Sequence, residues 1–289
     1  IFTFFATIMV LYKKYDVIIC SSGPITLGFP LILSKLFRRK KTVFEVRDLW
    51  PHGAIELGII KNNLLVSLSL FFEKLIYNFT DIIITLSIGQ KKHIKSRFTN
   101  SEIYVIENSS DNSLFENISG NPIPKKIKEK KILAHFGSLG LIHNINFWIS
   151  LAYEIKKLNY ENVNFIFIGD GKEKKQLEYI SKQKKLNNLF FLGKKPKKDL
   201  PVWFQNSYAT LFSTTSNPVQ DTSSPNKIFD SFAASIPIIQ TSRGWIKKLV
   251  EEYECGINLD FDDVKSSAKK VVKYLKNNNL RQIHSANAK

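Results

Sequence analysis

The sequence predicts an α/β protein with two parallel sheets that helices cover. Short runs of β-branched residues alternate with longer segments of helical periodicity along most of the chain, as in parallel sheets whose strands are joined by helices. A stretch without periodicity, residues 111–130, carries Gly, two Pro and a run of lysines, which is typical of a linker. The length of 289 residues fits two domains of about 150 residues each. We expect a first domain over residues 1–118, a linker over 119–130 and a second domain over 131–289.

The strands are expected where short apolar runs are rich in Ile and Val. In the first domain they are residues 16–20, 42–46, 81–86 and 103–106. In the second domain they are residues 132–136, 164–168, 189–192, 208–212, 237–240 and 256–259. Ligands of open parallel sheets bind beyond the carboxyl ends of the strands, so the residues that follow these strands are candidates for a site.

Composition restricts the classes of function. Hydrophobic residues make up 44% and charged residues 23% of the chain, which is ordinary for a packed globular protein. A net charge of +17 calls for an anionic partner, such as nucleic acid, a membrane surface or a phosphorylated ligand. No nucleic-acid-reading motif is recognisable, so we expect no nucleic-acid partner. Cys20 and Cys255 are too few for a disulfide framework or a cysteine zinc site, and they fit a reducing compartment.

The chain opens on an apolar run, Ile1 to Tyr12, which Lys13 and Lys14 close. The run is shorter than the roughly 20 residues that a membrane-spanning helix needs. It also lacks the basic start and the small-residue cleavage site of a signal peptide. We expect an amphipathic or buried helix here and no membrane-spanning segment.

Most of the usual catalytic and metal-binding signatures are absent from the sequence. Asp260 and Asp262 form a D-x-D pattern, which other transferases use to hold a metal-bound nucleotide. They stand just before an expected helix, where acidic residues are favoured without any metal. We therefore expect helix capping there, with metal binding as the less favoured alternative.

Two glycine-containing turns follow strands of the second domain. Gly137, Ser138 and Gly140 lie at the end of strand 132–136, where glycines let backbone N–H groups approach an anion. A plain tight turn is an equal alternative for this loop. For the turn IGDG at residues 168–171 we expect a structural role.

The sequence SSPNKIFD combines a helix start with a cation. Ser224 suits the N-cap and Pro225 the first helical position, so Asn226 and Lys227 fall in the first turn. A lysine is unfavourable at this positive end of a helix unless an anion binds there. Asp230 lies about one turn further on the same face, where it can accept hydrogen bonds from a ribose diol. A surface ion pair between Lys227 and Asp230 is the alternative.

Strand 42–46 ends in charged and aromatic residues, in the sequence FEVRDLWP. Arg47 and Asp48 are therefore candidate site residues at the carboxyl end of a strand. A buried structural interaction between the two side chains is the alternative.

Taken in order, these segments resemble the retaining glycosyltransferases of the GT-B fold, in particular family four and its bacterial surface-polysaccharide transferases. The resemblance covers residues 16–289 and rests on blocks in the family's order, VFEVRDLWPHGAIELG, VIENSSDNSLF, AHFGSLGLIHN, FIGDGKEKKQLE, NLFFLGKKPKKDLP and SPNKIFDSFAASIPII. It implies two Rossmann-like domains with parallel sheets facing across a cleft. It also implies a truncated first domain, because family members carry further strands before the segment that matches Asp16.

The resemblance implies that the second domain binds a nucleotide-diphosphate sugar. The donor-binding residues that it implies are Gly137, Ser138, Gly140, Ser224, Asn226, Lys227 and Asp230. The glycine loop matches the loop that contacts the diphosphate, and Asp230 matches the acid that contacts the ribose. Arg47 and Asp48 would be the catalytic residues, which contact the sugar and the acceptor.

The sequence also departs from the family's pattern. Thr222 stands where the first glutamate of a two-glutamate motif is usual. Ser138 and His143 stand where many members have Arg and Lys, so two phosphate-binding cations are missing. Arg47 stands where many members carry a histidine that faces the sugar.

The implied activity is sugar transfer from a UDP-sugar to a lipid-linked saccharide in surface-polysaccharide assembly, without a metal or cofactor. Such an acceptor implies a cytoplasmic protein, peripheral at the inner face of the cell membrane. The apolar run 1–12, Lys13, Lys14 and the cluster Arg38 to Lys41 would hold it to the anionic surface. The alternatives are a GT-B nucleotide-sugar epimerase, which shares the donor site, and a non-catalytic donor-binding remnant.

Overall fold

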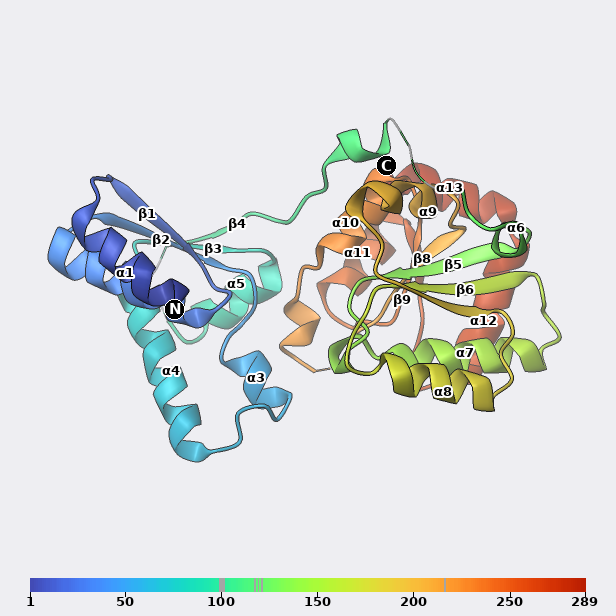
Figure 1. Cartoon of the computed structure of the whole chain (residues 1–289), viewed down its shortest axis with the longest axis horizontal. Coiled ribbons are helices and arrows are strands. Elements are labelled where there is room, and N and C mark those ends of the chain that lie inside the picture. Colours follow the sequence, from blue (N-terminus) through green and yellow to red (C-terminus); the bar gives the residue numbers. More distant parts are fainter. Residues whose placement is uncertain (99–101, 117, 119, 121, 216) are drawn as a thin grey trace. The chain divides into compact units, whose positions relative to one another are not determined.

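The computed structural model describes residues 1–98, 102–116, 118, 120, 122–215 and 217–289. The chain forms two compact units (Figure 1). The first unit comprises Ile1–Asn108 together with Asn217–Ser224, and the second comprises Ser109–Ser216 together with Pro225–Lys289. Each unit is built around one parallel sheet.

The sheet of the first unit has four strands in the order β1-β2-β3-β4, and every neighbouring pair is parallel. The strands are β1 (Val17–Ser21), β2 (Lys41–Val46), β3 (Ile82–Thr85) and β4 (Glu102–Val105). The α-helices are α1 (Phe2–Tyr12), α2 (Gly28–Leu33), α3 (His52–Glu56), α4 (Asn63–Asn78) and α5 (Ile88–Lys95). Leu31, Phe44, Ile76 and Ile83 form the centre of the core between this sheet and its helices. The four strands expected in this part of the sequence are confirmed.

A segment distant in sequence folds with the first unit. Val219 is 5% exposed and packs in the core of this unit. The Ser87 hydroxyl donates a hydrogen bond to the Thr222 carbonyl at 2.6 Å. Residues 217–224 therefore belong with the first unit, an excursion that the domain boundaries expected from local patterns do not contain.

α1 is neither buried nor amphipathic, so the expectation for this helix is wrong. None of its residues is buried, and Phe4, Phe5 and Met9 are 65%, 59% and 52% exposed. The run carries no charged residue that would mark a solvent face, so its pattern could not show which side chains lie outside. Within the residues that the structure describes, every helix is too short or too polar to cross a membrane.

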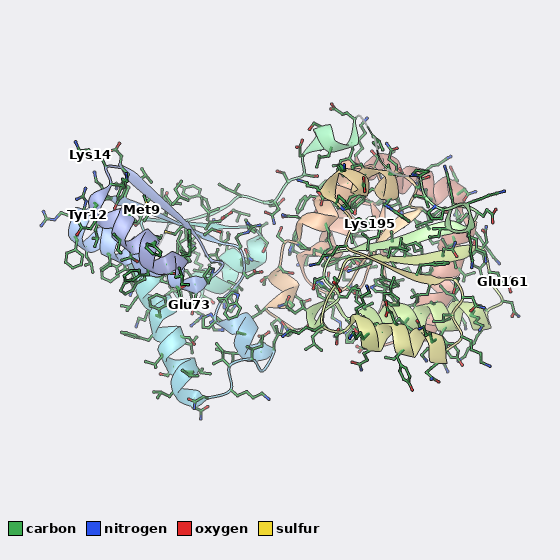
Figure 2. All side chains as sticks on the ribbon, in the orientation of Figure 1. Met9, Tyr12, Lys14, Glu73, Glu161 and Lys195 are labelled. Carbon is green, nitrogen blue, oxygen red and sulfur yellow. The ribbon has the colours of Figure 1, made fainter. Side chains whose placement is uncertain are left out.

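Basic residues lie beside the C-terminal end of α1. The Arg38 guanidinium donates a hydrogen bond to the Leu11 carbonyl at 3.0 Å, which brings the cluster Arg38–Lys41 against the helix end. Figure 2 shows Tyr12 and Lys14 at this end. Exposed apolar side chains and exposed cations therefore share one region of the first unit.

The sheet of the second unit has six strands in the order β10-β9-β8-β5-β6-β7. The strands are β5 (Lys131–Phe136), β6 (Val163–Ile168), β7 (Leu189–Gly193), β8 (Ala209–Phe212), β9 (Ile238–Gln240) and β10 (Gly256–Asn258). They confirm the expected strands and the α/β class. β5 lies between β6 and β8. From β5 the chain adds β6 and β7 on one side, and it then adds β8, β9 and β10 on the other side. The carboxyl ends of β5 and β8 thus form a topological switch point, where open α/β sheets bind ligands.

Helices cover both faces of this sheet (Figure 1). On one face lie α7 (Ile145–Lys157), α8 (Lys174–Gln183) and α12 (Val264–Lys276). On the other lie α6 (Lys125–Lys128), α9 (Leu200–Gln205), α10 (Asn226–Ala233) and α11 (Trp245–Tyr253), and α13 (Asn278–Ala288) follows α12. Neighbouring strand residues such as Phe165 and Ile166 point to opposite faces and are both fully buried.

Part of the segment expected as a linker, residues 119–130, packs on the second unit. It contains α6, and Ile123 and Ile127 are 8% and 5% exposed against β5 and β6. Lysines surround these two isoleucines in the sequence, so the composition of the segment did not indicate that it packs on a core. Residues 119 and 121 lie outside the described part of the chain.

Candidate active site

The switch point of the second unit brings together the glycine loop 137–140 and the start of α10. The loop follows β5 directly. A Cβ atom added at Gly137 would lie 3.0 Å from the Lys227 ammonium, so the first turn of α10 lies against this loop. Two of the segments that the sequence singled out are therefore neighbours.

The turn 168–171 supports the glycine loop through backbone contact. The N–H group of Gly137 donates to the Ile168 carbonyl, and that of Leu139 donates to the Asp170 carbonyl, each at 2.9 Å. A Cβ atom at Gly169 would lie 1.7 Å from the Gly137 carbonyl oxygen, and φ at Gly169 is +150°. Only glycine fits there, which confirms the structural role expected for this turn.

The Lys227 ammonium is buried and unpaired. Its Nζ atom has no hydrogen-bond partner among the described residues and is inaccessible to solvent. It lies 6.0 Å from the centre of the Phe212 ring, at the end of β8. Burial lowers the pKa of Lys227 to about 8. A buried cation without a partner costs free energy, and an anion bound in the loop would offset that cost.

Two histidines lie near this lysine, and both are held neutral. Burial and the charge of Lys227 lower the pKa of His143 to about 3, and the same causes hold the pKa of His135 well below its usual range. The Nδ1 atom of His143 is buried without a hydrogen-bond partner among the described residues. His143 is thus a neutral hydrogen-bonding group rather than a cation.

The start of α10 differs from the prediction by one residue. Pro225 is the N-cap in extended conformation, α10 begins at Asn226, and no side chain caps it. Ser224 is buried, but its hydroxyl has no hydrogen-bond partner in the described structure, so its predicted capping role is wrong. Because Pro225 is extended, the Ser224 side chain is one residue too far from the free N–H groups. These N–H groups are left to bind another acceptor, such as an anion.

Asp230 is fixed by a partner that the sequence did not suggest. Its Oδ1 atom accepts a hydrogen bond from the Ser110 hydroxyl at 2.6 Å. No ion pair joins it to Lys227 in the described part of the chain, so the alternative of a surface ion pair is not found. Ser110 lies between the strand expected at residues 103–106 and the aperiodic stretch 111–130, and no local pattern pairs it with Asp230.

Arg47 and Asp48 follow β2 in the first unit. The Arg47 N–H group donates to the Ser22 hydroxyl at 2.9 Å, and the Gln90 side-chain amide donates to the Arg47 carbonyl at 3.0 Å. Both residues are exposed, but the Asp48 carboxyl is partly shielded from water, which raises its pKa against the opposing charge of Arg47. Arg47 and Asp48 thus interact electrostatically without forming a fully buried pair. The backbone of this turn is well held, and its side chains are free to contact a ligand.

The predicted site residues thus fall into separate groups. Gly137, Ser138, Gly140, Asn226, Lys227 and Asp230 belong to the second unit. Arg47 and Asp48 belong to the first unit, and Ser224 ends the segment that folds with it. Sequence reasoning missed the support that Ser22 and Gln90 give to Arg47, because Ser22 follows β1 and Gln90 lies in the first turn of α5, both distant from Arg47 in the sequence.

The D-x-D pattern has a structural explanation. Asp260 and Asp262 both form ion pairs with Arg243. The cap of α12 is the next residue, Asp263, whose carboxylate accepts from the Ser266 N–H group at 2.9 Å. The expected capping by the pattern itself is therefore wrong by one residue. Among the described residues, no group of His, Cys, Asp and Glu could hold a metal ion.

The family pattern of Glycosyl transferases group 1 matches residues 121–289. This match spans more than half of the chain and contains the glycine loop, the turn 168–171 and α10. The chain therefore belongs to the Glycosyl transferases group 1 family.

Individual proteins agree with this assignment. An uncharacterized glycosyltransferase of Methanocaldococcus jannaschii is 24% identical over 275 residues, which are 91% of this chain and 66% of the relative. A second one from the same organism is 26% identical over 220 residues, which are 73% of this chain and 51% of the relative. The chain thus spans between about half and two thirds of the length of these curated relatives.

Solved structures show the fold. Sucrose-phosphate synthase of Thermosynechococcus elongatus superposes with a TM-score of 0.78 at 13% identity, over 99% of this chain and 71% of that one. Anabaena HepE, solved in complex with UDP-glucose, superposes with a TM-score of 0.72 at 15% identity, over 99% of this chain and 75% of that one. These likenesses confirm the GT-B fold class expected from the sequence.

The contact between the two glycine turns predicts the effect of Gly169→Ala. The new Cβ would clash with the Gly137 carbonyl, in a backbone conformation that favours glycine. We therefore expect the free energy of unfolding of the second unit to fall by about 2–3 kcal/mol. Denaturant unfolding measures this loss. Gly140→Ala is the matched control, because its Cβ would meet only the Ser138 hydroxyl at 3.4 Å. Equal free energies of unfolding of the two variants would contradict the close approach of the two turns at Gly169.

Proposed function

We propose that this protein is a retaining glycosyltransferase that moves a sugar from a nucleotide-diphosphate sugar, with UDP as the nucleotide. The observation that carries the proposal is the buried, unpaired Lys227 beside the glycine loop. The proposal is supported by family membership and by the likeness to HepE, which was solved with UDP-glucose.

The chemistry follows from where negative charge develops. Breaking the bond between sugar and diphosphate leaves charge on the departing phosphate oxygens. The Lys227 ammonium, the N–H groups of Ser138 and Gly140 and the uncapped N-terminus of α10 would stabilise that charge, whereas the N–H groups of Gly137 and Leu139 already donate to carbonyls. These groups supply a positive potential of the kind that a metal ion supplies in other transferases, so we propose a metal-independent reaction.

The remaining site residues have proposed roles of orientation. Asp230, held by Ser110, would accept the ribose hydroxyls. The neutral His143 would hydrogen-bond a phosphate oxygen without adding charge. Arg47 and Asp48, at the end of β2, would bear on the sugar and the acceptor.

We further propose a lipid-linked saccharide as the acceptor, reached at an anionic membrane surface in surface-polysaccharide assembly. The support is the exposed apolar α1 together with Lys13, Lys14 and the cluster Arg38–Lys41 beside its end. Apolar side chains insert at the boundary between headgroups and acyl chains, while cations attract anionic lipids. This combination suits a protein that lies on a membrane.

Calorimetry with UDP tests the donor site directly. Burial lowers the pKa of Lys227 to about 8 from the ordinary 10.5. A bound diphosphate favours the ammonium, so UDP affinity should fall above this pKa by up to about tenfold per pH unit. The unfolded chain binds the proton more tightly than the unliganded fold, so stability should rise between pH 8 and 10.5.

Lys227→Gln should weaken UDP binding about 10- to 100-fold, the value of one or two hydrogen bonds to a charged group. It should also remove the pH dependence above 8. Lys265→Gln, an exposed lysine of α12, is the control and should bind like the unchanged protein. Undiminished UDP binding by Lys227→Gln would overturn the assignment of this lysine.

The reaction class is tested by incubation with UDP-sugar. Sugar transfer that requires an added lipid-linked saccharide supports the proposal. Epimerisation without an acceptor would make the protein a nucleotide-sugar epimerase. UDP binding with no reaction of either kind would identify a donor-binding remnant.

Sedimentation with anionic vesicles tests the membrane proposal. Arg39→Gln/Lys41→Gln changes two exposed cations and should weaken binding about 30-fold, at about 1 kcal/mol each. Phe4→Ser/Met9→Ser should weaken it at every salt concentration, because apolar insertion is not screened. Lys265→Gln/Lys269→Gln removes the same charge from the second unit and should have little effect. Equal losses for all three variants would refute a specific membrane face.

A further inference from the structure

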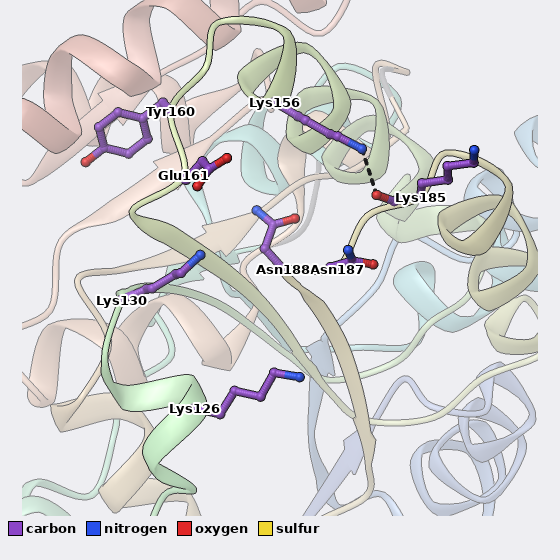
Figure 3. A pocket seen from close by; sticks show the side chains of 8 residues that line it. All are labelled: Lys126, Lys130, Lys156, Tyr160, Glu161, Lys185, Asn187 and Asn188. Atoms are coloured by element: carbon purple, nitrogen blue, oxygen red, sulfur yellow. Dashed lines mark hydrogen bonds between the residues drawn. The ribbon is translucent and has the colours of Figure 1, made fainter.

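The second unit carries a cavity far from the candidate active site in its sheet. The cavity has a volume of about 340 Å³ and is lined by Lys126, Lys130, Lys156, Tyr160, Glu161, Lys185, Asn187 and Asn188 (Figure 3). We call it the lysine pocket. Its volume lies within the range of about 300–1,000 Å³ that is typical of small-molecule sites.

The lysine pocket lies at the opposite edge of the sheet from the glycine loop. Its residues precede β5, β6 and β7 in the chain. All strands of this sheet are parallel, so their amino ends share one edge, whereas the glycine loop follows the carboxyl end of β5. A ligand in the lysine pocket therefore cannot be the sugar donor bound at the switch point.

The positive charge of the lysine pocket exceeds the negative charge of its lining residues. Four lysines line it with a single carboxylate, that of Glu161. No carboxylate lies within 4.0 Å of these four ammonium groups in the part of the chain described. Clustered like charges repel one another and raise the local concentration of anions.

Among the described residues, a hydrogen-bond partner is found for the ammonium group of Lys156 and for none of the other three, although Lys126 also lies in the last turn of a helix, α6. Lys156 lies in the last turn of α7 and donates to the Lys185 carbonyl at 2.8 Å, beyond the end of α8. Cations are favoured at such helix ends. Lys126 and Lys130 come from the short α6 and the residues after it, and Figure 3 shows both extending toward the cavity from the opposite side.

The other lining groups suit hydroxyls rather than apolar atoms. Glu161 can accept hydrogen bonds, the Asn187 amide can donate and accept, and Tyr160 offers a ring face and a hydroxyl. The Asn188 side chain is held by donation to the Val163 carbonyl at 3.0 Å, which keeps its own amide oxygen available. Such a mixture matches a ligand with both an anionic group and several hydroxyls.

We propose that the lysine pocket binds a phosphorylated saccharide, with the phosphate between Lys126, Lys130 and Lys156 and the sugar hydroxyls on Glu161 and Asn187. The same chemistry occurs in a free sugar phosphate and in a phosphate-bearing glycan chain. The pocket does not rest on the proposed transfer reaction, because it shares no residue with the donor site.

Calorimetry or NMR titration of the full chain with glucose 6-phosphate, inorganic phosphate and glucose tests the proposal. Glucose 6-phosphate should bind tighter than inorganic phosphate, and glucose should not bind detectably. Lys126→Gln/Lys130→Gln should weaken glucose 6-phosphate about tenfold or more, while UDP binding stays unchanged. Lys126 is exposed and Lys130 is half-buried, and neither belongs to a buried core cluster, so the variant should fold normally.

Lys265→Gln/Lys269→Gln is the matched control, because both lysines are exposed on α12 and line no part of the pocket. A phosphate-bearing oligosaccharide forms a second arm, and tighter binding than glucose 6-phosphate would identify a glycan chain as the source. Equal weakening by the two double variants would overturn the proposal, since only general electrostatic attraction would then be present. Equal affinities for glucose 6-phosphate and inorganic phosphate would overturn it too.

Discussion

The backbone contact between Gly137 and Gly169 is the constraint on which the candidate site depends. It joins the turns that follow β5 and β6, and no side chain fits between them. Because the two turns are fixed to each other, the N–H groups of the loop 137–140 have a fixed place at the end of the sheet. The same loop leaves room for the Lys227 ammonium, which would lie 3.0 Å from a Cβ atom at Gly137. Two glycines thus determine how closely a cation and a backbone loop approach.

The polar groups of the site favour the binding of an anion. Among the residues that the structure describes, the buried Lys227 ammonium has no hydrogen-bond partner, the start of α10 has no side-chain cap, and the neutral His143 has a ring nitrogen without a partner. Each of these features costs stability when no partner group binds it. A diphosphate would supply partners for all of them at once, and the free energy of binding would offset that cost. Donor binding then does not require a cation at Ser138 or at His143.

The sequence predicted the strands well because each is a short apolar run, mostly rich in Ile and Val, that is separated from the next by a helix or a turn. It predicted Lys227 as an anion-binding residue, because a lysine in the first turn of a helix contradicts the helix dipole. It could not predict that this lysine is buried, since Gly137 and Phe212, which lie beside its ammonium, come from the loop after β5 and from the end of β8. The capping roles predicted for Ser224 and Asp262 were wrong for a local reason, because a shift of one residue in a helix start moves the cap to another residue.

The prediction for α1 was wrong because its apolar run has no charged residue to mark the exposed face. The path of residues 217–224 into the first unit depends on tertiary packing of Val219, which no local pattern encodes.

The most direct test of the account is the pKa of Lys227 itself, measured by NMR of the side-chain ammonium in lysine-labelled protein with and without UDP. The account predicts a pKa of about 8 in the free protein and a clear upward shift on addition of UDP, because the diphosphate stabilises the charged form. A pKa at the ordinary 10.5 in the free protein, or one that UDP leaves unchanged, would contradict the claim that this buried cation holds the donor's phosphates.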